Sequence, residues 1–424
     1  MLGSGHARRL ALAVPVVTAL AIAAAVLPAA AGASTRYVSN AAQFQSAVAA
    51  FRQSGGTIVL RRHIYTATMV VGRRSTRRLT IVGAGARVQL LELNDTQHVK
   101  VRHLFVHPLS ADGGIVAQSS SHLVFQGDSF TADGTRHTVT LDLDHSDTVT
   151  VRASRFSHCG DRTPQWALCL LPRWASHVTV EGNWFHDCFG CDFIHGRAGP
   201  AFTVENNRFA RALACHHSWV KCGHSDDIEL FAADGMLVRR NVFGVNQRGG
   251  AQLYMANVVD HVRIVNNLFI RHDPRAPGVI PRIGIQVGTR VPRPDPLDVQ
   301  IVNNTILSGR RTASHAATSI LLSPHYGLVP ADERPVIVNT VLARLDDTSL
   351  VCPDAGFLKA DVAGTGAGCL GITVGDPALT ATGFPTSSST LLINQAARRW
   401  APPRDLLEHP RVGRPDIGCY EYTG

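Results

Sequence analysis

The chain has 424 residues, of which 45% are hydrophobic and only 17% are charged, so it is long and apolar enough to bury a large core. Its 41 Lys and Arg residues exceed its 32 Asp and Glu residues, which gives a formal charge of +9 at pH 7. This excess favours an acidic partner. Nucleic acid is the weaker interpretation, because no basic helix, RNP-like aromatic pattern or zinc-finger spacing accompanies the charge.

Residues 1–33 are typical of a secretory signal peptide. Arg8 and Arg9 precede an apolar run, which ends at the small residues Ala31-Gly32-Ala33. An uncleaved membrane anchor is the alternative, but prolines interrupt the run, and no later stretch is long and apolar enough to span a bilayer. We therefore expect a secreted protein with no membrane insertion after cleavage. Loss of the two Arg residues lowers the formal charge from +9 to +7.

Residues 34–56 are predicted to form an N-terminal cap. Asn40 is placed to cap a short helix from Ala41 to Arg52, on which Phe44 and Val48 share one apolar face. Such a helix would cover the open end of a stack of strands, where unpaired edges otherwise invite aggregation.

Residues 57–345 contain an internal repeat. In one copy, His177 to Phe185, apolar and polar residues alternate, Asn183 marks a turn and a Phe follows two residues later. The other copies cover 123–130, 149–156, 202–209, 237–243, 262–269 and 299–306. Such a unit cannot bury an apolar face alone, so the copies must stack as a β-solenoid. We expect roughly ten coils at a strand spacing of ~4.8 Å.

The Asn of each copy is expected to tolerate left-handed backbone angles and to hydrogen-bond its counterpart in the next coil. The Phe is expected to stack on the Phe of adjacent coils, about 4.8 Å away. At these residues the chain resembles the secreted right-handed parallel β-helix proteins of the pectate-lyase-like superfamily. The resemblance covers most of the chain after residue 33. It implies an all-β fold, a right-handed parallel β-helix with a short N-terminal capping helix.

Residues 346–424 are predicted to be an irregular C-terminal extension and cap. Beyond Leu342 the repeat dissolves into Gly-, Ala- and Ser-rich sequence. Residues 413–421 then resemble the closing phrase of many secreted β-helix proteins, with Cys419 where that phrase usually has Ala.

The nine cysteines predict disulfides rather than a metal site in an exported protein. Cys188 and Cys191 have the spacing of a redox or zinc motif, but no partner pair lies at zinc spacing. The pairing is only partly constrained by the sequence. The candidate pairs are Cys215 with Cys222, Cys352 with Cys369, and Cys159 with Cys188, and Cys419 is among the cysteines that these pairs leave over.

In the superfamily that the chain resembles, substrate usually lies along the outer face of the first strand of each coil. Strand alternation turns Ile228 and Leu230 inward, and Asp227 and Glu229 outward. The stacked first strands are expected to form a polar stripe of Asp142, Asp144, Asp192, Asp227, Glu229, Gln252 and Gln286. Close carboxylates repel, so the stripe requires a cation, an Arg or raised pKa values. An ordinary solvated face is the alternative.

The loop over 215–224, which leads into Asp226 and Asp227, is the densest cluster of reactive side chains. We expect the catalytic residues to be Lys221, His224, Arg248 and Asp227, and the substrate-binding residues to be His216, His217, Trp219 and Tyr254. For any one of these residues, a surface or packing role is at least as well supported. Asp192 and His195 are the next candidates if Asp227 proves dispensable.

Three functions fit these residues. The first is a polysaccharide lyase or epimerase that acts on a uronate polymer, with Ca²⁺ held by Asp192, Asp227 and Glu229. The second is an inverting glycoside hydrolase, because Asp226-Asp227 resembles the double Asp of β-helical polygalacturonases. Against it, this chain lacks the Asn-Thr-Asp and Arg-Ile-Lys motifs of that family. The third is a non-catalytic carbohydrate-binding or cell-surface β-helix. In each case we expect an acidic polysaccharide partner and a monomer.

Overall fold

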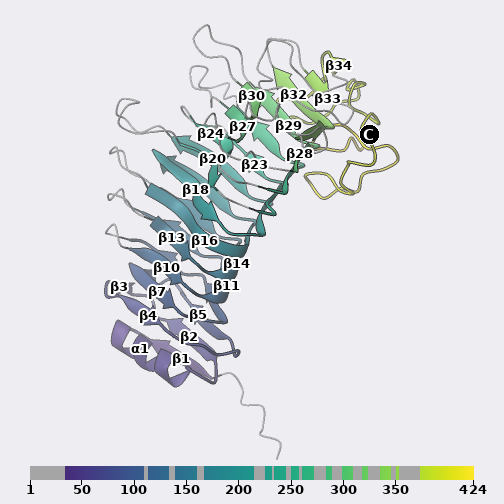
Figure 1. Cartoon of the computed structure of the whole chain (residues 1–424). Coiled ribbons are helices and arrows are strands. Elements are labelled where there is room, and N and C mark those ends of the chain that lie inside the picture. Colours follow the sequence, from purple (N-terminus) through teal and green to yellow (C-terminus); the bar gives the residue numbers. More distant parts are fainter. Residues whose placement is uncertain are drawn as a thin grey trace, which may run out of the picture. The chain divides into compact units, whose positions relative to one another are not determined.

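The computed structural model describes residues 34–108, 113–132, 139–159, 167–213, 225–231, 234–244, 250–256, 260–271, 283–288, 298–308, 318–322, 335–344, 350–352 and 373–424. The segment predicted to be a signal peptide and the loop over 215–224 lie outside these residues. The unit from Thr35 to Gly424 is built from stacked coils (Figure 1). Along a complete coil the chain passes through three sheets, which we number 1, 2 and 3 in chain order.

Successive coils pair in parallel, so each sheet runs through the stack with strands in a fixed register. Sheet 1 contains β4 (Met69–Val71), β7 (Leu90–Asn94), β10 (Gly114–Gln118), β13 (Val139–Asp144), the first part of β16 (Ala167–Glu181), β18 (Cys191–Ala198), β21 (Ile228–Phe231), β24 (Ala251–Ala256), β27 (Ile283–Val287) and β30 (Thr318–Leu322).

Sheet 2 contains β1 (Thr35–Val38), β2 (Gly56–Leu60), β5 (Leu79–Val82), β8 (Val99–Arg102), β11 (Ser121–Gln126), β14 (Asp147–Arg152), the second part of β16, β19 (Phe202–Glu205), β22 (Leu237–Arg239), β25 (Val262–Val265), β28 (Val299–Val302) and β31 (Val336–Val338). Sheet 3 contains β3 (Ile64–Tyr65), β6 (Arg87–Val88), β9 (Phe105–Val106), β12 (Ser129–Thr131), β15 (Arg155–Ser157), β17 (Trp184–Phe189), β20 (Arg208–Leu213), β23 (Val242–Phe243), β26 (Leu268–Ile270), β29 (Thr305–Ser308), β32 (Thr340–Arg344), β33 (Leu350–Cys352) and β34 (Thr373–Val374). Among these described strands, the antiparallel pairings are those of β32 with β33 and of β33 with β34.

The expected right-handed parallel β-helix is therefore confirmed, as is its capping helix. Helix α1 spans Ala41–Ala50. The Asn40 side chain accepts a hydrogen bond from the Gln43 N–H at 2.9 Å, and Gln43 accepts one from the Ser39 N–H at 2.8 Å. This reciprocal pair fixes the start of the helix. The buried face of α1 contacts β1, β2 and β4 at one end of the stack.

A buried ladder of amides joins the turns between sheets 2 and 3. The Asn183 N–H donates to Asn207 Oδ1 at 2.8 Å, and the Asn207 N–H donates to Asn241 Oδ1 at 2.9 Å. The ladder continues through Asn267 to Asn304, and each side-chain amide also donates to a backbone carbonyl of the preceding coil. Because buried polar groups must be hydrogen-bonded, this ladder satisfies each turn only when the coils are in register.

The expected backbone role of the ladder Asn was wrong. The left-handed residue is the one before it, such as Asn206 with a φ of 56° or Asn266 with a φ of 54°. In copies with two Asn residues, the first therefore makes the turn and the second joins the ladder. Gly182 and Arg240 take the left-handed position in the two copies with a single Asn, and Gly127 and Ala153 take it in the two copies without one.

The Phe column stacks as predicted. Ring centroids of successive residues lie 4.4 to 4.9 Å apart, and every ring is buried. The column consists of Phe130, Phe156, Phe185, Phe209, Phe243 and Phe269. These rings line the inner side of sheet 3 and belong to one continuous core. The inward residues of sheet 1 pack in the same core, which holds sheet 1 in place.

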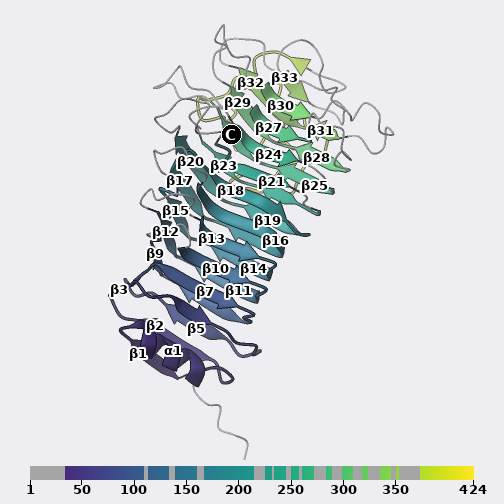
Figure 2. The same ribbon diagram turned by 60° about the vertical axis from the view of Figure 1, so that its left-hand side comes forward.

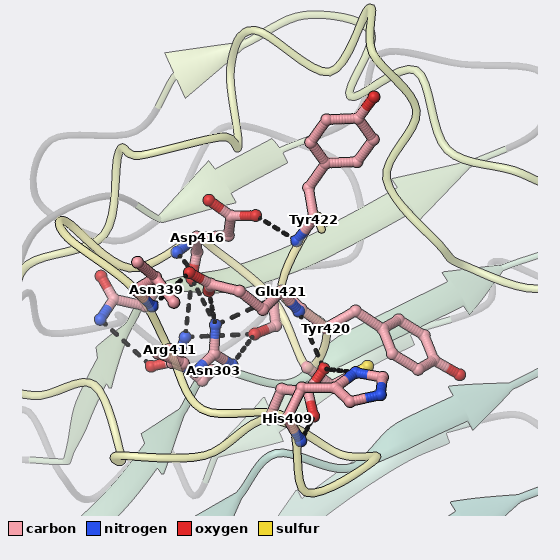
Figure 3. Close-up of polar contacts among 12 residues, drawn as sticks. Asn303, Asn339, His409, Arg411, Asp416, Tyr420, Glu421 and Tyr422 are labelled. Carbon is pink, nitrogen blue, oxygen red and sulfur yellow. Dashed lines mark hydrogen bonds and ion pairs between the residues drawn. The ribbon is translucent and has the colours of Figure 1, made fainter. Parts of the chain in front are cut away.

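The C-terminal segment, residues 373–424, covers the later strands of sheet 3 (Figure 1). Figure 3 shows its polar anchor. Arg411 is 1% exposed and donates to Asn266 Oδ1 and to Glu421 Oε2, both at 3.0 Å. Asn303 donates to the carbonyls of Asp416 and Gly418. The segment is thus tied to the left-handed Asn residues of two coils.

Cys419 is buried, without a disulfide, and its N–H donates to Thr305 Oγ1 at 3.0 Å. The predicted pair of Cys159 with Cys188 was wrong. Cys159 is bonded to Cys169, and Cys188 to Cys191. Cys169, at the start of β16 in sheet 1, lies at a Cα–Cα distance of 5.2 Å from Cys159, which follows β15 of sheet 3, so the bond joins the end of one coil to the first strand of the next. The partners proposed for Cys222 and for Cys352 lie outside the described residues.

Asp128 occupies the Asn position of an earlier coil. One carboxylate oxygen accepts from the Leu104 N–H at 2.8 Å, whereas the other is buried without a hydrogen-bond partner among the described residues. Burial raises the pKa of Asp128 to about 7 from 3.8, against the opposing hydrogen bonds from the backbone. Stability from the protonated acid is therefore present at low pH and lost as pH rises through about 7.

We predict that Asp128→Asn stabilises the protein at pH 8, because a neutral amide avoids a buried charge and donates as the ladder Asn residues do. The gain should be on the order of 1–2 kcal/mol and smaller at pH 5. Thermal unfolding at both pH values measures it. Asp95→Asn, at an exposed carboxylate paired with Arg74, is the control and should change little. A lower Tm for Asp128→Asn at pH 8 would contradict the ladder's proposed role.

Candidate functional site

The outer face of sheet 1 brings three of the predicted residues together. His195 of β18 pairs in register with Glu229 of β21, which pairs in register with Tyr254 of β24. Inward residues of the same strands, such as Ile194 and Ile228, are fully buried and fix this register. Asp192 lies three residues before His195 on β18. The fold therefore gathers a carboxylate, an imidazole, a second carboxylate and a phenol from successive coils.

His195 is the centre of this acid cluster, defined by Asp192, His195 and Glu229. Its Nδ1 lies 2.9 Å from Asp192 Oδ2 and 3.0 Å from Glu229 Oε2. The other Asp192 oxygen accepts from the Asp226 N–H at 2.7 Å. Both carboxylates are buried, and the His195 side chain is 21% exposed. One imidazolium thus lies between two carboxylates at the edge of solvent.

Burial alone lowers the pKa of His195, but its hydrogen bonds to the carboxylates of Asp192 and Glu229, with their negative charges, outweigh burial and raise the pKa to about 10. His195 is therefore a cation at neutral pH and cannot accept a proton there. Burial, reinforced by the charges of Glu229 and Asp226, raises the pKa of Tyr254. Tyr254 therefore remains a protonated hydrogen-bond donor.

We predict that the protein loses stability as pH rises from 7 towards 10. The folded pKa of His195 is raised, so its contribution is complete below 6.5 and disappears as pH passes through about 10. Thermal unfolding between pH 7 and 10.5 should show a steeper fall for the native protein than for His195→Gln. His122→Gln, at an exposed histidine, is the control and should keep the native slope. Equal slopes for the native protein and His195→Gln would show that the cation contributes nothing.

The acid cluster also defines a candidate metal site. Its three ligand atoms lie within 4.8 Å of one another. Calcium prefers oxygen ligands, whereas a set with an imidazole nitrogen suits zinc or another transition metal. The cluster contains Asp192 and Glu229 of the predicted calcium set, with His195 in place of Asp227. The three cysteines of the other candidate group, Cys169, Cys188 and Cys191, are engaged in disulfides.

The predicted exposure of the carboxylate stripe was wrong at its centre. Asp227 is 0% exposed and Glu229 is 4% exposed. Position 227 lies beside Phe193 of the preceding coil, whose ring contacts Phe185 and Phe209 of the core. Strand alternation predicts a side but does not reveal that this part of the strand lies at the corner between sheets 1 and 3. Asp227 is therefore in the packed interior.

A hollow of about 540 Å³ lies beside the acid cluster. Its lining includes Asp144, His145, Arg173, Trp174, His195 and Arg197. Strand β16 bends here as it passes from sheet 1 into sheet 2, with a register shift between Arg173 and Ala175 and a left-handed φ of 58° at Trp174. The bend leaves the Trp174 side chain 44% exposed. It supplies a flat aromatic surface at the rim of the hollow.

The polar groups of the hollow are held in pairs. The Arg197 guanidinium lies over the Trp174 ring at 5.2 Å from its centroid. Arg173 forms an ion pair with Asp142, and its Nε donates to Asp142 Oδ1 at 3.1 Å. The Nδ1 of His145 lies 2.7 Å from Asp144 Oδ1. The second ring nitrogen of His145 is then the one available for proton transfer.

Sequence reasoning missed this hollow. The predicted loop cluster, His216, His217, Trp219, Lys221, His224 and Arg248, lies outside the described residues. Arg173 and Arg197 pair in register one coil apart, at the same spacing as Phe185 and Phe209. From that shared spacing, the pairing of Arg173 with Arg197 could have been predicted. No sequence pattern indicates the bend at Trp174, which exposes the ring.

A family model described as "Right handed beta helix region" matches residues 90–308. This is more than half of the chain, so the chain belongs to the right-handed β-helix family. No curated protein matches the sequence. The described residues include no helix of the length and apolarity needed to cross a membrane.

Several solved structures are similar in fold at low sequence identity. Pectate lyase Pel9A is 13% identical with a TM-score of 0.48, covering 92% of this chain and 98% of its own. PfbA, a surface adhesin of Streptococcus pneumoniae, is 9% identical with a TM-score of 0.45, covering 74% of this chain and 94% of its own. The alginate lyase AlyGC is 12% identical with a TM-score of 0.30, covering 90% of this chain and 60% of its own.

Proposed function

We propose that the protein is exported, binds an acidic polysaccharide on the outer face of sheet 1 and acts on it as a polysaccharide lyase or epimerase. The hollow carries this proposal, because it combines an exposed aromatic ring, a guanidinium over that ring and a carboxylate-held imidazole. Sugar rings stack on aromatic faces through their apolar side, and a guanidinium pairs with a carboxylate. A uronate presents both features.

The chemistry follows from three residues. Arg197 pairs with the sugar carboxylate, which makes the proton on the adjacent carbon more acidic. His145, with Nδ1 held by Asp144, removes that proton through its other nitrogen. In a lyase, the electron pair then forms a carbon–carbon double bond and the glycosidic oxygen departs, taking up a proton. In an epimerase, solvent water delivers a proton to the opposite face of that carbon instead, and His145 releases the proton that it removed to solvent.

The acid cluster has a supporting role in this proposal. His195 remains protonated and neutralises much of the charge on Asp192 and Glu229 beneath the hollow, so an anionic sugar meets less repulsion. Calcium is the alternative source of positive charge, with Asp192 and Glu229 as its oxygen ligands. That arrangement requires His195 to leave its position between the two carboxylates.

The inverting hydrolase is less well supported. The ligand oxygens of Asp192 and Glu229 lie within 4.8 Å of each other, and both contact His195. An inverting pair stands roughly 6.5–9.5 Å apart to admit a water molecule. A non-catalytic binding protein is the better second candidate, because Trp174 and Arg197 suffice to hold a sugar and the acid cluster is already neutralised internally.

We predict that His145→Gln lowers kcat by roughly 10²–10⁴-fold on the uronate polymer that the native protein degrades, as loss of a general base commonly does. Absorbance of the unsaturated product measures elimination, and proton exchange at the sugar measures epimerisation. His177→Gln is a matched control, since His177 is equally exposed and its Nδ1 also lies 2.7 Å from a carboxylate, that of Asp147, but away from the hollow. Native activity in His145→Gln would refute this role for His145.

We predict that chelation by EDTA leaves that activity unchanged, because Arg197 and His195 supply the positive charge. Complete loss of activity, restored by added Ca²⁺, would favour the calcium arrangement at Asp192 and Glu229. Binding of uronate polymers without elimination, hydrolysis or proton exchange would instead establish the non-catalytic function.

A further inference from the structure

The outer face of sheet 3 changes character along the stack. On the later coils it is apolar and covered, since Leu268, Leu307 and Val341 pack against the C-terminal segment. On the earlier coils it carries a row of residues that pair in register from strand to strand. This sheet 3 stripe consists of Arg87, Phe105, Ser129, Arg155, Trp184 and Arg208. Figure 2 shows the corresponding strands β9, β12, β15, β17 and β20 one above another.

Trp184 is the exposed aromatic residue of the stripe. Its side chain is 43% exposed, although its ring stacks on the buried His186 ring at a centroid distance of 4.0 Å. The Arg155 guanidinium lies 4.8 Å from the centroid of the Trp184 ring. Arg155 and Arg208 flank Trp184 in register on its two neighbouring strands. The indole thus lies beside the Arg155 guanidinium, with Arg208 at the matching position of the next strand.

A part-buried hydrogen-bond chain fixes this arrangement. Arg155 Nε donates to His186 Nε2 at 2.6 Å, and His186 Nδ1 lies 2.7 Å from Asp187 Oδ2. Burial lowers the pKa of His186, in keeping with a neutral ring that donates at Nδ1 and accepts at Nε2. Because Arg155 and the ring beneath Trp184 are both held, little side-chain entropy is lost when a ligand binds.

The charge of the stripe is one-sided. Its positions hold three Arg residues and no acid, and the nearby Asp187 is engaged by Arg211 Nε at 3.0 Å as well as by His186. We propose that the sheet 3 stripe is a second binding surface for an acidic polysaccharide, separate from the hollow on sheet 1. Trp184 stacks on a sugar ring, and Arg155 and Arg208 pair with carboxylates on the neighbouring sugars.

The stripe suits a polysaccharide better than a single-stranded nucleic acid. Nucleic-acid grooves present aromatic rings on which successive bases stack. Here the two aromatic positions, Phe105 and Trp184, are separated by Ser129 and Arg155, so successive bases would find no adjacent rings on which to stack. One partly exposed ring with Arg residues on the neighbouring strands matches one stacked sugar with charged neighbours.

Affinity electrophoresis in native gels that contain polygalacturonate or alginate tests this proposal. All variants carry Trp174→Ala, which removes the aromatic surface of the sheet 1 hollow. In that background we expect Trp184→Ala to weaken the apparent Kd by at least about tenfold, as loss of an aromatic hot spot does. Trp184→Phe should keep most of the affinity and shows that the fold is intact. Arg208→Gln should reduce the salt dependence of binding.

Trp400→Ala is the matched control, since its ring also lies beneath a guanidinium, that of Arg399 at 5.7 Å, but in the C-terminal segment. It should leave retardation unchanged. Retardation that is equal with and without Trp184, or absent from the Trp174→Ala protein in both polymers, would overturn the proposal. A stronger, Trp184-dependent retardation by a single-stranded oligonucleotide would reassign the stripe to nucleic acid. The His145→Gln assay is independent of all these outcomes, so the two proposals fail separately.

Discussion

The buried amide ladder from Asn183 to Asn304 is the interaction on which the rest of the structure depends. Each rung donates to the next coil and to a carbonyl of the preceding one, so a slip of one residue would leave buried amides without partners. Such a group costs about 1–3 kcal/mol, and the cost would recur in every coil. The ladder therefore fixes the register of the coils, while the Phe column beside it supplies apolar burial that is less sensitive to register.

That register places the functional groups. His195 faces Glu229 and Arg173 faces Arg197 only because neighbouring coils are aligned residue by residue. The loops between coils vary in length without disturbing this alignment. The same alignment builds two different surfaces. In the hollow on sheet 1, carboxylates are paired with cations. The stripe on sheet 3 contains Arg and aromatic residues and no acidic residue.

The repeat made the fold predictable, because the alternation, the Asn and the Phe recur together and each has one structural use. Cys159 was paired wrongly because the prediction considered only equivalent positions of successive coils, whereas the true partner, Cys169, lies on the next strand along the chain, at a sequence separation of 10. Asp227 was expected outside because alternation gives the side of a strand but not the packing at its end. The surface around Trp174 was missed because it depends on a bend within β16. The register shift at this bend cannot be predicted from a local sequence pattern.

A crystal structure with a bound uronate oligosaccharide tests the central claim most directly, since the claim is that the outer face of sheet 1 is the functional site. The account predicts a sugar ring against Trp174, its carboxylate at Arg197 and the carbon that loses a proton within reach of His145. An oligosaccharide bound only away from this hollow, with Trp174 and Arg197 untouched, would contradict it.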